Sequence, residues 1–147
     1  MSDLVTVILA AGKGTRMKSA LPKVLHRVGG KSMLQHVLDA AKQAGSRRDI
    51  VVVGFGGEKV KEAMGDQAEF VVQKEQLGTG HAVQQTASLL AGETGTVMVL
   101  CGDTPLLTGD LLRKLYDAHK EAGAKATVLT AIMPDATGYG RIIRTAT

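Results

Sequence analysis

The chain has 147 residues, 44% of them apolar and 22% charged, which is typical of one ordinary globular domain and excludes a disordered chain. Its longest apolar run falls far short of a membrane span, its first residues do not resemble a signal peptide, and its single cysteine cannot form an internal disulfide, so a reducing cytoplasm is expected. The net charge is +4, with nine Lys or Arg against two Asp in the first 48 residues, which favours a local anion site over a surface that coats nucleic acid.

The hydrophobic pattern predicts alternating strands and helices along the chain. In chain order we expect a strand over 4–10, a helix over 33–44, a strand over 49–54, a helix over 58–64, a strand over 69–73, a helix from 80 to about 90, a strand over 96–101, a helix over 109–122, and strand-like runs over 126–133 and 139–144. Ser32 and Thr108 are suited to cap their helices, and Gly45 and Gly123 to end them.

This order of elements predicts the fold class. Three of the strands are nearly continuous in Val, Ile, Leu and Met, which is typical of parallel strands buried on both faces. We therefore expect a three-layer α/β fold with a mostly parallel sheet and right-handed crossovers, of which residues 1–147 form one part. Because strand-like runs end the sequence with no element to cover them, we also expect the fold to be incomplete at its C-terminus.

A glycine loop with basic side chains follows the first strand, where open α/β sheets bind their ligands. Gly12 and Gly14 allow backbone N–H groups to approach an anion, and Lys13 and Arg16 add positive charge, as does Lys23 seven residues further on. A tight turn with solvated cations is the alternative, but three cations in eleven residues favour a phosphate site.

Two familiar phosphate loops do not match this segment. The spacing of its glycines and lysine is not that of a Walker A loop. The dinucleotide-binding fingerprint requires a small residue where Met17 stands, and no acidic residue closes the second strand.

Three other segments carry polar groups at turns. Gln73 ends the third strand and can both donate to and accept from the edge of a base. Asp103 follows the fourth strand, and Mg²⁺ takes one or two carboxylates together with phosphate oxygens, so Asp103 is the candidate metal ligand. The third segment, 138–141, places two glycines around Tyr139. A β–α turn, an Asp turn and a hairpin turn are the respective structural alternatives.

These motifs resemble a known family. The stretch 9–17 followed by Leu21-Pro22-Lys23 resembles the signature of sugar nucleotidyltransferases. The stretches 22–26, 75–82 and 137–142 are similar to the uridylyltransferase half of the bacterial bifunctional N-acetylglucosamine-1-phosphate uridylyltransferase/glucosamine-1-phosphate acetyltransferases. The resemblance covers residues 4–144 and implies a Rossmann-like nucleotide-diphospho-sugar transferase fold.

The resemblance also implies roles for individual residues. Arg16 and Lys23 are the expected catalytic residues, which stabilise charge on the phosphates, and Asp103 is the expected ligand of Mg²⁺. Gln73, Gly78 and Thr79 are expected to hold uracil, and Gly140 to contact the acetamido-sugar. The complete expected substrate-binding set is Leu9, Ala10, Ala11, Gly12, Lys13, Gly14, Lys23, Gln73, Gly78, Thr79, Cys101, Gly102, Asp103 and Gly140.

The implied reaction transfers UMP from UTP to N-acetylglucosamine 1-phosphate, giving UDP-N-acetylglucosamine and pyrophosphate, for peptidoglycan and lipopolysaccharide precursors. The resemblance further implies a longer parent protein that also acetylates glucosamine 1-phosphate and forms a homotrimer through a C-terminal domain. No nucleic-acid or membrane partner is expected. The isolated chain is expected to be weakly active or inactive.

Two alternatives to this function stay open. One is a related sugar-phosphate nucleotidyltransferase with another base or sugar, and the other is a nucleotide-binding half-domain without catalysis.

Overall fold

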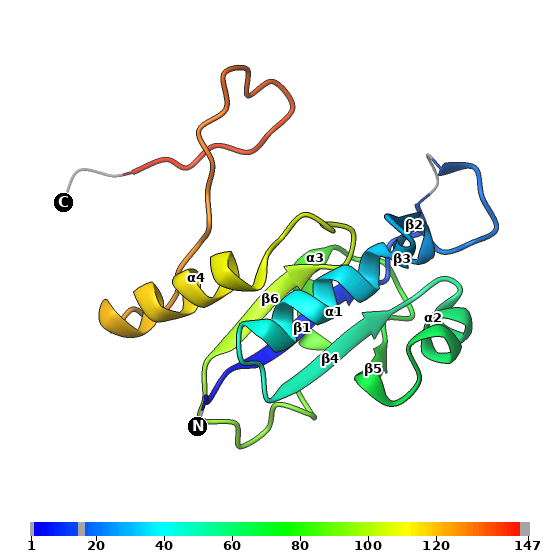
Figure 1. Cartoon of the computed structure of the whole chain (residues 1–147), viewed down its shortest axis with the longest axis horizontal. Helices are drawn as coiled ribbons and strands as arrows, with labels where there is room; N and C mark the ends of the chain where they lie inside the picture. Colours follow the sequence, from blue (N-terminus) through cyan, green and yellow to red (C-terminus); the bar gives the residue numbers. More distant parts are fainter. Residues whose placement is uncertain (1, 15–16, 145–147) are drawn as a thin grey trace.

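The computed structural model describes residues 2–14 and 17–144, and its centre is a parallel four-stranded sheet (Figure 1). The strands are β1 (Val5–Ala10), β4 (Arg48–Val53), β5 (Glu69–Val72) and β6 (Val97–Cys101). They lie in the order β5-β4-β1-β6, and every pairing is parallel. The predicted α/β class and the first four predicted strands are therefore confirmed, with ends that differ by at most one residue.

The two central strands explain why the sheet forms from these residues. β1 pairs with β4 from Val5↔Arg48 to Ala10↔Val53, and nearly all of these side chains are buried. β-branched side chains suit a pleated surface that is covered on both faces. In β6, at the edge, buried residues alternate with exposed ones, so one face of this strand is uncovered.

Helices cover both faces of the sheet and give it three layers. Helices α1 (Met33–Gln43), α2 (Gly57–Met64) and α4 (Gly109–Glu121) share one hydrophobic cluster with β1 and β4, and α1 packs against α4. The second face is covered by α3 (Thr79–Gln84) and the segment that follows it. In Figure 1, α1 crosses in front of the sheet and α3 lies behind it.

Side-chain caps set the start of both long helices, as the sequence predicts. The backbone N–H of Gln35 donates to Ser32 Oγ at 3.1 Å, and that of Leu111 donates to Thr108 Oγ1 at 3.2 Å. Each bond satisfies one of the N–H groups that a helix leaves unpaired in its first turn.

Helix α3 is shorter than predicted. It ends at Gln84, and turns follow up to about residue 92. Thr86 is fully buried, and its hydroxyl donates to the carbonyl of Val83 at 2.7 Å. The backbone N–H of Thr86 donates to the same carbonyl at 2.9 Å, so bonds between residues three apart replace the α-helical pattern at this point.

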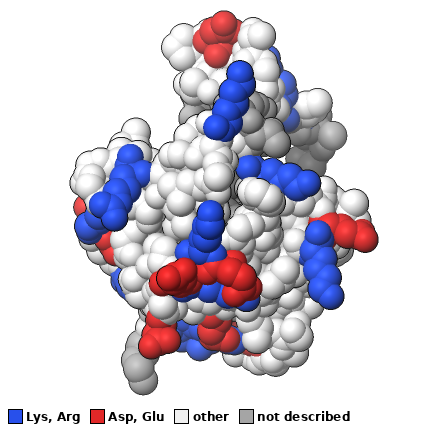
Figure 2. Space-filling view, turned by 90° about the vertical axis from the view of Figure 1, so that its right-hand side faces the viewer, with Lys and Arg blue, Asp and Glu red and all other residues white. Residues whose placement is uncertain are grey.

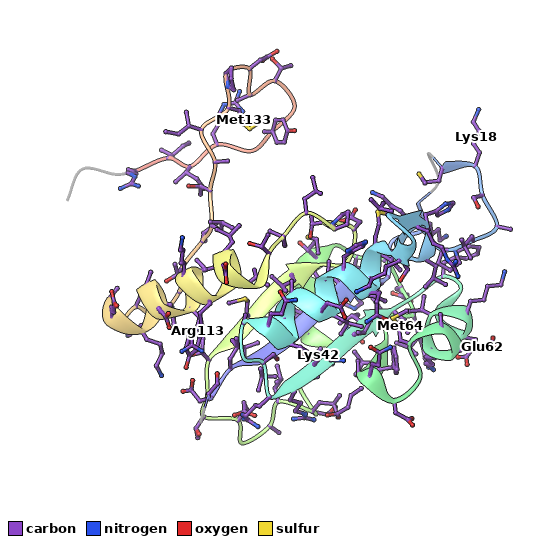
Figure 3. The ribbon with its side chains drawn as sticks, viewed as in Figure 1. Lys18, Lys42, Glu62, Met64, Arg113 and Met133 are labelled. Carbon is purple, nitrogen blue, oxygen red and sulfur yellow. The ribbon has the colours of Figure 1, made fainter. Side chains whose placement is uncertain are left out.

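The predictions of strands over 126–133 and 139–144 are wrong for the described residues. This segment has no regular secondary structure, and its apolar side chains are exposed, with Ile132 entirely so. Figures 1 and 3 show it standing away from the body, with Met133 near the bend of its loop. A strand requires a neighbouring strand to satisfy its backbone groups, and this segment has none.

Several short elements were not predicted. They are the 3₁₀-helix η2 (Lys23–Leu25), the hairpin of β2 (Arg27–Val28) and β3 (Lys31–Ser32), and the 3₁₀-helix η3 (Gly65–Gln67). The hairpin turns on Gly29 and Gly30, whose φ angles of 57° and 88° favour glycine. Among the described residues, none of the helices is both long and apolar enough to pass through a lipid bilayer.

Candidate nucleotide-binding site

The topology of the sheet positions a cavity at the carboxyl ends of its strands. After β1 the chain adds β4 and β5 on one side, then crosses to place β6 on the other. The loops that follow β1 and β6 therefore diverge, and such a point is where α/β sheets bind ligands. A cavity of about 310 Å³ lies there, lined by Leu9, Ala10, Ala11, Gly12, Lys23, Val24, Gln73, Gln76, Gly78, Thr79, Ala82, Cys101 and Asp103. Ten of these thirteen belong to the predicted site.

An ion pair joins two residues that are eighty positions apart in the sequence. Lys23 Nζ donates to Asp103 Oδ2 at 2.7 Å. Lys23 begins η2, and Asp103 lies two residues after β6. Both side chains remain partly open to solvent, at 41% and 35% exposure, so a ligand in the cavity can reach them. The structure thus brings together the predicted cation and the predicted metal ligand.

The glycine loop packs directly on this pair. Gly14 has a φ of 59°, and a Cβ atom there would stand 2.8 Å from the Lys23 Cβ. Glycine at position 14 therefore allows the loop to approach Lys23.

Lys13 lines an adjacent hollow of about 570 Å³ that shares Gln73 and Gln76 with the first cavity. Arg16, the other predicted catalytic residue, lies outside the described residues.

Gln73 lines the side of the cavity that faces β5, away from Asp103, which follows β6. Its side chain is only 5% exposed, and its backbone N–H donates to the carbonyl of Val53 at 2.8 Å. Its Nε2 donates to the carbonyl of Gly78 at 3.1 Å and lies 3.0 Å from His81 Nδ1. Gly78 caps α3 at its N-terminus, so one helix end positions Gln73, Gly78 and Thr79 together.

The floor of the cavity joins β1 to β6. The N–H of Gly102 donates to the carbonyl of Leu9 at 2.9 Å, and Gly102 is buried beneath the residues that line the cavity. Cys101 lies beside it and is exposed, and partial desolvation together with the nearby Asp103 carboxylate raises the pKa of its thiol. The thiol is therefore protonated at neutral pH, which does not favour a nucleophile.

Sequence reasoning did not select three of the lining residues, Val24, Gln76 and Ala82. Gln76 is the informative one, because its side-chain amide donates to the carbonyl of Ala11 and joins the 73–80 turn to the glycine loop. Its place within the same polar turn as Gln73 could have identified it. Val24 and Ala82 are buried apolar residues, and nothing local in the sequence distinguishes them from core residues.

Gly140 lies elsewhere. It belongs to the exposed segment beyond α4, and no residue of that segment lines the cavity. The expected contact of Gly140 with a sugar stays a prediction.

The residues present fit a divalent ion that arrives with a ligand. No group of three or more His, Cys, Asp or Glu side chains gathers into a metal site within the described part of the chain. Asp103 offers one carboxylate at the cavity. Mg²⁺ is commonly bound by one or two carboxylates and completes its shell with phosphate oxygens and water.

The charge of the surface agrees with a local site. On the face drawn in Figure 2, basic side chains of the described residues are separated by uncharged surface and by Asp and Glu, rather than forming a continuous basic area. This distribution differs from the basic stripe that binds a nucleic-acid backbone.

A parallel α/β sheet with a glycine loop after its first strand and a Lys–Asp pair at the switch point defines a nucleotide-binding α/β domain. Residues 6–134 match the MobA-like NTP transferase domain family, and the chain belongs to that family.

Curated relatives extend this comparison. The chain is 58% identical over 144 residues to the bifunctional protein GlmU of Bacillus cereus strain AH187, and equally to that of Bacillus mycoides strain KBAB4. Each match covers 98% of this chain and 31% of the relative, so the chain spans about a third of the length of these relatives.

Solved structures agree on the fold. Rv0371c of Mycobacterium tuberculosis H37Rv is 25% identical with a TM-score of 0.70, over 82% of this chain and 62% of that one. A manganese complex of the same protein is 27% identical with a TM-score of 0.63, over 80% and 60%. A nucleotidyl transferase from Methanothermobacter, Mth528, is 22% identical with a TM-score of 0.63, over 78% and 56%, and supports the fold alone.

Proposed function

We propose that this chain is the nucleotide-binding part of a sugar-phosphate uridylyltransferase, which transfers UMP from UTP to N-acetylglucosamine 1-phosphate and releases pyrophosphate. The observation that carries the proposal is the Lys23–Asp103 pair in the cavity that Gln73 also lines. This cavity therefore combines a cation, a carboxylate that could bind a metal, and an amide that can form hydrogen bonds. The 58% identity to GlmU supports the choice of substrates.

The proposed reaction requires little covalent help from the protein. The phosphate oxygen of the sugar phosphate is already anionic at neutral pH, so no general base is needed. Its approach to the α-phosphate of UTP is opposed by charge repulsion. Catalysis then consists of placing the two groups in line and offsetting their charges.

The residues of the cavity suit these two tasks. Lys23 supplies a fixed positive charge next to the phosphates, with Lys13 from the adjacent hollow and Arg16 assigned the same role by prediction. The backbone from Leu9 to Gly12 and the turn at Gly78 and Thr79 would hold the nucleoside.

Asp103 would hold a divalent ion, which we assign as Mg²⁺. When bound, the ion would offset the charge of the phosphates. The Asp103 carboxylate shares Oδ2 with Lys23 and can offer its other oxygen to a metal.

The longer relatives suggest what surrounds this chain. We propose that residues 1–147 form the nucleotide-binding part of a larger transferase domain in a cytoplasmic protein. The acetyl transfer, the homotrimer and the role in peptidoglycan and lipopolysaccharide precursor synthesis belong to the same proposal, and none of them is assigned to the described residues. We expect the isolated chain to bind UTP but to turn it over poorly.

A thermal-shift comparison of UTP, dTTP and CTP tests the proposal on this chain. A preferred ligand at 100 times its Kd should add about 2.7 kcal/mol of stability. We expect UTP to stabilise the chain most. A preference for dTTP or CTP would favour the transferase with another base, and no stabilisation by any of the three would contradict a nucleotide site.

Catalysis is tested separately by release of pyrophosphate from UTP. We expect slow release that requires both Mg²⁺ and N-acetylglucosamine 1-phosphate. Binding of UTP without any release, even at high enzyme concentration, would favour the half-domain that binds without catalysis. Rapid turnover by the isolated chain would contradict the expected weak activity.

A further inference from the structure

The side-chain amide of Gln73 has only one orientation that fits its surroundings. The carbonyl oxygen of Gly78 can only accept, so the atom that lies 3.1 Å from it must be Nε2, the donor. The Gly78 carbonyl therefore favours the orientation in which Nε2 faces the protein. Nε2 has a second hydrogen, and the atom placed to receive it is His81 Nδ1, at 3.0 Å.

The contact with His81 gives the amide a second partner. Since Gln73 Nε2 can only donate, His81 Nδ1 is the acceptor in this hydrogen bond. The amide nitrogen of Gln85 lies 3.2 Å from His81 Nε2 and donates to the His81 carbonyl at 3.0 Å.

With Nε2 used twice, Gln73 presents its oxygen to a ligand. Oε1 accepts no hydrogen bond from the described residues, and Gln73 lines the cavity. Uracil carries a donor at N3, which an amide oxygen can accept. Cytosine carries an acceptor at N3. The lone pair of that nitrogen would face a lone pair of the Gln73 amide oxygen, and the two would repel each other. If the amide of Gln73 were reversed or free to rotate, it would no longer distinguish uracil from cytosine.

We propose that His81 is a specificity-determining positioning residue, whose Nδ1 fixes the amide of Gln73 so that the cavity prefers uracil over cytosine. His81 does not itself line the cavity, so it acts through Gln73. The proposal deepens the proposed function and rests on it, because it presumes a nucleotide base beside Gln73.

Two substitutions separate the hydrogen bond from packing. His81→Asn places an amide oxygen close to the position of Nδ1 and retains an acceptor for Gln73. His81→Leu has similar bulk and suits a helix but offers no acceptor. Gln84→Leu, at an exposed position of the same helix, is the control for a change of surface alone.

The measurement is the ratio of the dissociation constants for CTP and UTP, determined by calorimetry on each variant of the full chain. A ratio taken on the same sample cancels any loss of folded protein. We expect His81→Leu to lower the ratio about fivefold to tenfold, which corresponds to one hydrogen bond. His81→Asn and Gln84→Leu should keep the ratio of the unmodified chain.

Each outcome decides the proposal. An unchanged ratio in His81→Leu would overturn it, and an equal loss in His81→Leu and His81→Asn would assign His81 to packing and overturn it as well. If the unmodified chain binds neither nucleotide, or binds both equally, the proposed function itself fails. A chain that prefers UTP while His81→Leu keeps that preference would refute the role of His81 alone.

Discussion

Lys23 occupies a position where its charge matters more to a ligand than to the fold. Its side chain is 41% exposed, and a partly exposed ion pair contributes little to stability. We expect Lys23→Ala to leave unfolding nearly unchanged and to weaken UTP binding about tenfold to a hundredfold, as loss of one charged hydrogen bond would. Calorimetric titration with UTP measures this effect.

A second lysine provides the control. Lys18 lies on the loop after β1, and Figure 3 shows its side chain pointing away from the body of the molecule. Lys18→Ala removes the same charge from the chain without reaching the cavity. Similar losses in both variants would indicate that overall charge, not the position of Lys23, attracts the nucleotide.

Asp103 should make nucleotide binding depend on a divalent ion. In the unmodified chain we expect UTP to bind more tightly with Mg²⁺ than with EDTA, because the carboxylate repels bare phosphates but attracts the ion. In Asp103→Asn this difference should largely vanish. In EDTA the variant should bind UTP at least as tightly as the unmodified chain, since Lys23 is then free for the phosphates.

The matched control for Asp103 is Asp135→Asn in the exposed segment, where the carboxylate accepts from the N–H and the hydroxyl of Thr137. It should keep the full effect of Mg²⁺. If Asp103→Asn kept that effect too, the metal ligand would have to be sought elsewhere.

At the scale of elements, a buried carboxylate lies between β4 and α1. Asp49 is 8% exposed, its Oδ1 has no hydrogen-bond partner among the described residues, and burial raises its pKa above the ordinary value. A group with a raised pKa holds its proton more tightly in the folded state than in the unfolded one. Its contribution to stability is therefore full below the unfolded pKa and is lost as the pH rises through the folded pKa.

We accordingly expect Asp49→Asn to be more stable than the unmodified chain at pH 7. Relief of one unsatisfied buried group is worth on the order of 1 kcal/mol, or roughly 3 °C in Tm for a chain of this size. The gain should shrink as the pH falls toward 4, where Asp49 itself is protonated. Thermal unfolding across this pH range measures the difference.

Carboxylates with a lowered pKa change the stability with pH in the opposite direction. The comparison of Asp49→Asn with the unmodified chain therefore needs a control. Hydrogen bonds from Arg48 lower the pKa of Glu69, and such a group loses its contribution as the pH falls. Asp66→Asn, at an exposed position beside α2, removes a carboxylate without relieving burial. It should show no gain at pH 7, and an equal gain there would contradict the role assigned to Asp49.

Elements specified by local signals were predictable. The runs of β-branched residues in β1 and β4 and the caps Ser32 and Thr108 act within one element, so the sequence alone shows them. The strand-like run 126–133 has the same local character, but a strand also needs a neighbour. That requirement is not visible in its own residues.

The candidate site likewise has one part that could be predicted from the sequence and one part that could not. Parallel strands bring their carboxyl ends to one edge, so Lys23 and Asp103 could be expected at one cavity even though eighty residues separate them. The hydrogen bonds of Gln73 and Gln76 depend on the path of a turn between β5 and α3. No periodicity encodes that path, which is why Gln76 was missed.

At the scale of the whole molecule, the nucleotide cavity and the segment beyond α4 are separate. Every residue that lines the cavity lies at or before Asp103, whereas the described residues 125–144 stand away from the body (Figure 1). The first residues of that segment lie against α4, where the Thr127 hydroxyl lies 2.9 Å from His119 Nδ1. The binding of nucleotide and the predicted contact of Gly140 with sugar should therefore be separable.

A chain that ends at Ala124 tests this separation. We expect it to unfold cooperatively and to bind UTP within about twofold of the full chain, because the lining of the cavity is intact. For Gly140 to contact the acetamido-sugar, the segment has to move toward the cavity. UDP-N-acetylglucosamine should then bind the full chain about threefold to tenfold more tightly than the shortened chain, as one or two hydrogen bonds would require. Equal affinity of the two chains for the sugar nucleotide would remove Gly140 from the site, while a large loss of UTP affinity would contradict the placement of the nucleotide between β1 and β6.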